Sequence, residues 1–229
     1  MRLPVRDLVR MKCIQINDLL LQYYGRPAWH NPMPPLDELV STILSQNTND
    51  VNRDRAFRAL RERFHTWEAV RDADINEVIA AIRSAGLANQ KGPRIQNILH
   101  DITIQRGSLD LSFLRDLPPD QARGWLLQYK GVGPKTSAIV LLFSLGMPAF
   151  PVDTHIYRVT GRLGVRPPKM SVEQAHEHLA ALFPSESYYA AHLNLIRLGR
   201  EICHPRQPNC PACPLKDLCD YYAALVNKR

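Results

Sequence analysis

The spacing of apolar residues constrains the fold of this chain more than any other feature of its sequence. Apolar residues recur at steps of three and four, as in Leu36, Leu39 and Val40, which places them on one face of an α-helix. Sustained alternation with a period of two, the pattern of half-buried strands, is missing from the sequence. Most of the 18 prolines and 11 glycines fall between the apolar stretches. The sequence therefore predicts an all-α chain of short helices joined by tight turns.

The expected helices have boundaries that are uncertain by a few residues. They cover about residues 8–25, 35–46, 50–64, 74–85, 91–106, 119–129, 134–146, 154–163, 171–183 and 187–203.

Length and charge narrow the class of protein. A chain of 229 residues is long enough for two small domains with buried cores. Its net charge of +7 favours a polyanionic partner, although a basic surface serves solubility equally well. No apolar stretch approaches the roughly 20 residues of a membrane-spanning helix, and the N-terminus lacks the apolar core of a signal peptide. We therefore expect a cytoplasmic protein that does not bind membranes.

A glycine-rich turn between two expected helices is the first candidate site. Residues 130–134 read Lys-Gly-Val-Gly-Pro, and the two glycines allow a sharp turn and a close approach of the backbone to another molecule. Pro134 suits the first turn of a helix, whose free N–H groups form an anion site that fits a phosphate. Taken by itself, the turn is equally compatible with a plain corner between helices.

Two residues near this turn have the chemistry of a reactive site. Lys135 lies in the first turn of the second helix, where the helix dipole disfavours its ammonium form. A neutral amine can attack a sugar C1′ and form a Schiff base. Eighteen residues later, Asp153 stands in a Val-Asp-Thr-His motif, where its structural role would be to cap a helix. A carboxylate there could also stabilise positive charge on a sugar, and His155 could bond to the nearby backbone or to a ligand.

Four of the five cysteines lie close together near the C-terminus. Their spacing is Cys-x6-Cys-x2-Cys-x5-Cys, from Cys203 through Cys210 and Cys213 to Cys219. In a reducing compartment this pattern indicates a metal or cluster site rather than disulfides. Cysteine chemistry alone leaves zinc and a [4Fe–4S] cluster equally compatible with the spacing. Cys13 stands apart and is expected to be a small buried apolar residue.

Together these motifs resemble a known family. The segment Leu-x-x-Tyr-Lys-Gly-Val-Gly-Pro-Lys-Thr and the later Val-Asp-Thr-His are similar to the helix-hairpin-helix and Gly/Pro…Asp motifs of DNA glycosylases, and most similar to endonuclease III. The resemblance implies that Lys135 and Asp153 are catalytic and that the four clustered cysteines bind a [4Fe–4S] cluster. Lys130 departs from the family, which commonly has proline there.

The resemblance also implies contacts with DNA. The polar run after Leu44 is similar to the family's glutamine-containing wedge, with Gln46 and Asn47 equally placed to fill the space of an extruded nucleotide. Leu87, in a turn that resembles Gly-Leu-x-Asn-x-Lys, would wedge into the opposite strand. The alternatives are helix capping by Asn49 or Asp50 and burial of Leu87 in a local core. The implied DNA contacts are Gln46, Asn47, Leu87, Lys91, Gly131, Val132, Gly133, Thr136, His155 and Arg206.

A second histidine motif is expected to have no such role. His176 and His178 are two residues apart on an expected helix, so they diverge in direction and are predicted to be surface residues.

The family resemblance implies two helical domains with a DNA-binding cleft between them. Residues 35–148 would form a six-helix barrel that contains the helix-hairpin-helix motif, and residues 1–34 with 149–229 would form an iron–sulfur cluster domain. The partner would be double-stranded DNA with a damaged base or an abasic site, bound by a monomer, which in a prokaryote would be associated with the nucleoid.

The implied activity is that of a bifunctional enzyme of base excision repair, a DNA N-glycosylase and DNA-(apurinic or apyrimidinic site) lyase. It would remove oxidised pyrimidines by lysine attack at C1′, followed by β-elimination. Two alternatives are a mismatch-specific thymine or adenine glycosylase of the same fold and a non-catalytic iron–sulfur protein that binds DNA. Lys135 disfavours the mismatch enzyme, whose family members generally lack this lysine.

Overall fold

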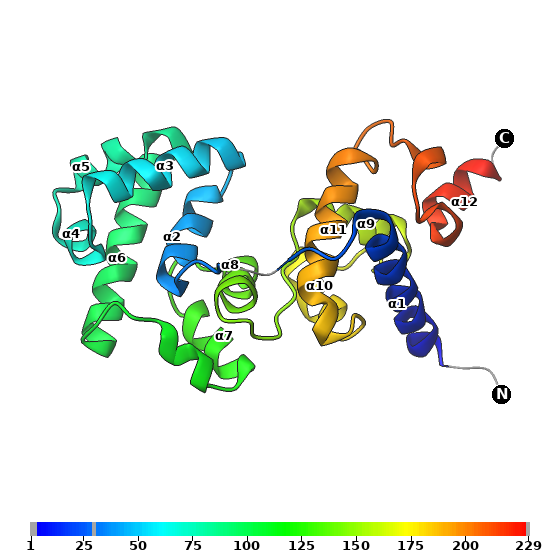
Figure 1. Cartoon of the computed structure of the whole chain (residues 1–229), viewed down its shortest axis with the longest axis horizontal. Coiled ribbons are helices and arrows are strands. Elements are labelled where there is room, and N and C mark those ends of the chain that lie inside the picture. The colour runs from blue at the N-terminus through cyan, green and yellow to red at the C-terminus, as the bar shows by residue number, and fades with distance from the viewer. Residues whose placement is uncertain (1–3, 29–30, 228–229) are drawn as a thin grey trace. The chain divides into compact units, whose positions relative to one another are not determined.

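A computed structural model describes residues 4–28 and 31–227, and this part of the chain contains helices and no β-strand (Figure 1). The prediction of an all-α fold is therefore confirmed. None of the helices in the described ranges combines the length and the hydrophobicity that a membrane crossing requires.

The chain divides into two compact units. The first, which we call the central unit, is Pro32–Met147. The second, which we call the terminal unit, combines Met1–Asn31 with Pro148–Arg229.

The central unit is built around one long helix, α6 (Ala88–Arg106), against which α2, α4 and α5 pack. Ile95, Ile98, Leu99 and Ile102 form the apolar face of α6 and are 0–3% exposed. The other helices are α2 (Pro35–Ser45), α3 (Asp50–Arg63), α4 (Trp67–Asp72), α5 (Ile75–Ala81), α7 (Pro119–Leu127) and α8 (Pro134–Ile139). Two 3₁₀ turns, Arg83–Ala85 and Ser112–Asp116, and a π-helical stretch, Val140–Ser144, complete it.

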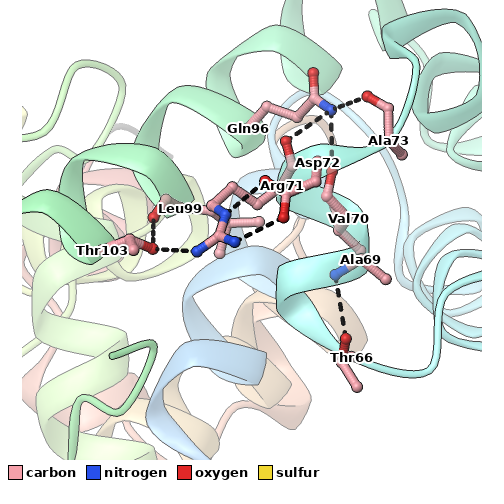
Figure 2. A network of polar contacts seen from close by, with 9 residues as sticks. All are labelled: Thr66, Ala69, Val70, Arg71, Asp72, Ala73, Gln96, Leu99 and Thr103. Atoms are coloured by element: carbon pink, nitrogen blue, oxygen red, sulfur yellow. Dashed lines mark hydrogen bonds and ion pairs between the residues drawn. The ribbon is translucent and has the colours of Figure 1, made fainter. Parts of the chain in front are cut away.

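The short helix α4 buries Trp67 and Val70, and polar groups at both of its ends hold it as well (Figure 2). At its start, the Thr66 hydroxyl accepts a hydrogen bond from the Ala69 N–H. At its end, the Gln96 amide of α6 donates to three backbone carbonyls at 2.8–3.3 Å, and Arg71 Nη1 donates to Thr103 Oγ1 at 3.0 Å. The Gln96 bonds satisfy carbonyls that a helix of this length would otherwise leave unpaired. They come from a distant segment, which explains why local periodicity did not predict α4.

The terminal unit packs α11 against both α9 and α1. Cys13 of α1 is fully buried, as predicted, and burial raises the pKa of its thiol to about 12. The helices are α1 (Val5–Tyr24), α9 (Thr154–Arg162), α10 (Val172–Ala180), α11 (Tyr188–Glu201) and α12 (Asp220–Val226). Short 3₁₀ turns occur at Ser185–Ser187, Cys210–Ala212 and Lys216–Leu218. Helix α12 is not among the helices predicted from the sequence.

Candidate nucleic-acid interface and cysteine site

The glycine-rich turn is a tight connection between α7 and α8. Gly131 has φ +91°, and a Cβ at this position would lie 2.3 Å from Arg94 Cδ. Glycine is therefore required both by the backbone conformation and by the side chain beneath it. Val132 is 5% exposed and its N–H donates to the Tyr129 carbonyl at 3.0 Å. The Val132 side chain thus anchors the turn, and the expected contact of Val132 with DNA stays a prediction.

Helix α8 begins directly after this turn with an open N-terminus. Gly133 provides no side-chain cap, and Pro134 is the first helical residue. The backbone N–H groups of Lys135 and Thr136 therefore have no acceptor within the helix. Lys135 is exposed in the first turn, as expected. Thr136 is only 4% exposed, so its side chain has a structural role, and the expected contact of Thr136 with DNA stays a prediction.

The loop between α2 and α3 gives its two amide residues different environments. Gln46 Oε1 accepts a hydrogen bond from Arg94 Nη1 at 2.8 Å, and Gln46 Nε2 donates to the Gly131 carbonyl at 3.1 Å. Asn47 is exposed and has φ +54°. Asn49 caps α3 by accepting from the Asn52 N–H at 2.9 Å, so the capping alternative holds for Asn49.

The turn before α6 projects an apolar side chain. Leu87 has φ +52° and is 47% exposed, so the alternative that it belongs to a local core is wrong. A left-handed conformation at a residue other than glycine costs roughly 1–3 kcal/mol and occurs mostly at functional sites. An exposed leucine in such a conformation fits an apolar wedge.

Lys91 is not available to DNA, and this corrects the sequence prediction. It is 1% exposed, and its Nζ donates to the Leu44 carbonyl at 2.7 Å and to the Ala85 carbonyl at 2.9 Å. Lys91 therefore satisfies the C-terminal carbonyls of α2 and of the Arg83–Ala85 turn. Burial, together with the charge of Arg94, lowers the pKa of Lys91.

In the terminal unit, Asp153 is the N-cap of α9. Its Oδ1 accepts from the Ile156 N–H at 2.7 Å, which confirms the capping role. Among the described residues, its Oδ2 has no hydrogen-bond partner, so this oxygen is left for another interaction.

Two buried histidines contact the backbone of residues 150–152, the segment that precedes Asp153. His176 Nδ1 lies 3.2 Å from the Val152 nitrogen and 3.1 Å from the Phe150 oxygen. His192 Nδ1 lies 2.9 Å from the Pro151 oxygen. The prediction that His176 is a surface residue is wrong, because His176 is only 6% exposed. His178 is half-buried and its Nε2 lies 2.9 Å from the Val165 oxygen.

His155 is half-buried between α9 and α11. Its Nδ1 lies 3.2 Å from Arg158 Nη2, and a Cβ at Gly199 would approach the His155 Cβ to 2.8 Å. Arg158 in turn donates to the carbonyls of Gly199 and Cys203, at 2.8 and 3.0 Å. His155 is therefore linked through Arg158 to the segment where the cysteines begin, while its contact with DNA stays a prediction.

The four predicted cysteines line one pocket. Its other lining residues are Arg162, Ile202, Pro208, Lys216, Tyr221 and Tyr222. Burial raises the pKa of Cys213 to about 11. Burial, followed by the nearby cysteine charges, also raises the pKa of Cys210. Bare thiolates are thus disfavoured in this pocket, and a positively charged metal centre would offset that cost.

Arg162 connects the pocket to its surroundings, although no sequence motif indicated it. Arg162 Nη1 donates to Cys203 Sγ at 3.2 Å and to the His204 carbonyl at 2.7 Å, and the guanidinium carbon lies 4.7 Å from the centre of the Tyr221 ring. Arg206 is exposed on the loop between the first two cysteines. Within the described ranges, no three side chains of His, Cys, Asp or Glu form a group that could hold a metal ion.

Comparison with known proteins identifies a family for most of the chain. Residues 40–185 match the model for the HhH-GPD superfamily base excision DNA repair protein. Endonuclease III of Sulfolobus acidocaldarius is 37% identical over 186 residues, which cover 80% of this chain and 81% of that protein. Protein ROS1C of Oryza sativa subsp. japonica is 37% identical over 175 residues, which cover 69% of this chain but 9% of that protein.

Most plant relatives are much longer, and the chain spans 9% to 57% of the length of the first five relatives found. A solved structure described as a non-covalent endonuclease III–DNA complex has a TM-score of 0.80 and 27% identity, and the match covers 95% of this chain and 98% of that one. Because the family model covers more than half of the sequence, the chain belongs to the HhH-GPD superfamily of base excision DNA repair proteins.

Proposed function

We propose that this protein is a bifunctional DNA glycosylase and AP lyase that removes oxidised pyrimidines. The similarity to endonuclease III, which extends over about four fifths of both chains, supports this proposal. The observation that carries it is the position of Lys135, an exposed primary amine in the first turn of α8, directly after the glycine-rich turn.

Lys135 is proposed to be the nucleophile. Its amine attacks C1′ of the damaged nucleotide and displaces the base. The C1′–O4′ bond then breaks, O4′ is protonated, and the opened sugar is held to lysine as a Schiff base. The imine acidifies the C2′ proton, so that β-elimination breaks the strand 3′ to the lesion. Removal of the amine should therefore abolish strand cleavage.

Asp153 is proposed to stabilise positive charge on the sugar or to accept the proton from the attacking amine. The cap bond from the Ile156 N–H supports an oriented carboxylate, because it fixes one of its two oxygens. His176 and His192 fix the preceding residues and so contribute to this orientation.

The proposed partner is double-stranded DNA with a damaged base or an abasic site. The net charge of +7 favours a polyanion, and the open N-terminus of α8 offers N–H groups to a phosphate. Leu87 would occupy the opened base stack, where an apolar side chain replaces lost stacking.

We also propose that Cys203, Cys210, Cys213 and Cys219 hold a [4Fe–4S] cluster. All four thiols line one pocket, and the donor set is the one that such clusters use. Each of the four cysteines would supply one thiolate to the cluster. Bound there, the cluster would supply positive charge to buried thiolates and tie the C-terminal segment together.

The activity is tested with a panel of duplexes that each carry one lesion, assayed separately for base release and for strand cleavage. The wild-type protein should act on thymine glycol and on hydroxylated or dihydro pyrimidines. Lys135→Gln should lose cleavage, while Lys169→Gln, the same change at an exposed lysine outside the proposed DNA contacts, should keep it. Release of only mismatched thymine or adenine, or binding without turnover, would instead support one of the two alternative functions.

The cofactor is tested by measuring iron, acid-labile sulfide and zinc in the protein as purified without added metal. Four irons and four sulfides per chain are expected for a [4Fe–4S] cluster. One zinc per chain with no sulfide would contradict the cluster and indicate a four-cysteine zinc site.

A further inference from the structure

Two basic residues of α6 connect three segments that are candidates for contact with DNA: the 46–49 loop, the Leu87 turn and the glycine-rich turn. Lys91 bonds to the carbonyls of Leu44 and Ala85, which lie just before the 46–49 loop and just before the Leu87 turn. Lys91 therefore fixes the points at which these two loops leave their helical segments. Because it is 1% exposed, it does so without contacting a ligand.

Arg94 makes the second connection, one helical turn further along α6. It donates to Gln46 Oε1 at 2.8 Å, and Gln46 Nε2 donates to the Gly131 carbonyl at 3.1 Å. The Arg94 side chain also lies directly beneath Gly131, where a Cβ would come within 2.3 Å of Arg94 Cδ. Gln46 of the 46–49 loop is thus bonded both to the backbone of the glycine-rich turn and to Arg94, and Arg94 in turn packs against Gly131 of that turn.

This arrangement separates the roles of Gln46 and Asn47. Both ends of the Gln46 amide are used inside the protein, and its bond to Arg94 is charge-assisted. Losing such a bond would disfavour a Gln46 that turns towards DNA by roughly 10- to 100-fold. Asn47 is exposed, makes no side-chain hydrogen bond within the described residues, and has a left-handed conformation that asparagine tolerates.

We propose that Arg94 is a positioning residue that acts through Gln46 to join the 46–49 loop to the glycine-rich turn, and that Asn47 is the amide offered to DNA. The proposal rests on the proposed function, because it assumes that a nucleotide is extruded. Asn47 carries two donors and one acceptor, which fit the exposed edge of the base left unpaired opposite the lesion.

The test measures binding to a duplex that contains a non-cleavable abasic analogue with 2-aminopurine opposite, whose fluorescence reports on stacking of the unpaired base. Asn47→Gly removes the amide and keeps the positive φ. It should weaken binding about 3- to 10-fold, as expected for the loss of one or two hydrogen bonds, and should change the fluorescence of the complex.

Gln46→Leu and Arg94→Met remove the two ends of the same link. Each should weaken binding to a similar extent, and the double variant should be no weaker than either single one, because coupled residues give non-additive effects. Thermal unfolding of each variant serves as the control for folding.

Two results would overturn the proposal. The first is an unchanged dissociation constant and fluorescence for Asn47→Gly. The second is a loss of binding in Gln46→Leu that adds fully to that of Arg94→Met, which would mean that Gln46 contacts DNA independently. A wild-type protein that does not prefer the abasic-analogue duplex to an intact duplex would instead remove the proposed function, and this inference with it.

Discussion

Replacement of Lys91 by methionine tests whether this lysine is structural. The change keeps the length of the side chain and removes the bonds to the carbonyls of Leu44 and Ala85, both of which belong to fully buried residues. A hydrogen bond from a charged donor contributes about 1.5–3 kcal/mol. The cost of burying the ammonium, visible in the lowered pKa of Lys91, offsets part of this contribution. We therefore expect a loss of about 3 kcal/mol in the free energy of unfolding.

The assay is equilibrium unfolding in urea, followed by tryptophan fluorescence. Trp67 and Trp125, two of the three tryptophans, lie in the central unit and report on its unfolding. Lys130→Met, the same change at an exposed lysine, is the matched control and should alter the free energy by less than about 0.5 kcal/mol. Equal stabilities of the Lys91 and Lys130 variants would refute the structural role of Lys91.

Other perturbations should give distinct results. Gly131→Ala forces a Cβ onto Arg94 in a left-handed backbone, so it should cost about 2–4 kcal/mol in urea unfolding; a cost below about 0.5 kcal/mol would contradict the packing. Burial lowers the pKa of Lys91 in the folded protein below its ordinary value of 10.5. At pH values between the folded and the unfolded pKa, the unfolded chain therefore binds more protons than the folded protein. In that pH range the free energy of unfolding of the wild type should rise with pH relative to that of Lys91→Met. A difference in unfolding free energy that is constant with pH would contradict this. Cys213→Ser should lower iron content and visible absorption, whereas Cys13→Ser should keep both; iron retained in full by the Cys213 variant would exclude it as a ligand.

Long helices with one apolar face could be predicted from the sequence, because their periodicity extends over several turns. The expected helix over 50–64 corresponds to Asp50–Arg63, and the expected helix over 154–163 to Thr154–Arg162. Helix α4 (Trp67–Asp72) was missed because six residues are too few for a periodic signal. Its stability depends on Gln96, which is distant in sequence.

The side chains of the site were harder to predict, because burial is a property of the tertiary structure. A local signal did exist for Lys91, which lies four residues before Ile95 and eight before Leu99, on the apolar face of α6. Arg94 gave no such signal, because its partners Gln46 and Gly131 come from two other segments. The motifs did locate Lys135 in the first turn of α8 and Asp153 at the N-cap of α9.

The central claim is that the amine of Lys135 forms a covalent bond with deoxyribose. The most direct measurement is borohydride reduction of the protein during reaction with a duplex that contains an abasic site, followed by proteolysis and mass spectrometry of the cross-linked peptide. The expected adduct is on Lys135, in the peptide that begins the α8 helix. An adduct on another lysine, or cross-linking by Lys135→Gln at the wild-type level, would contradict the account.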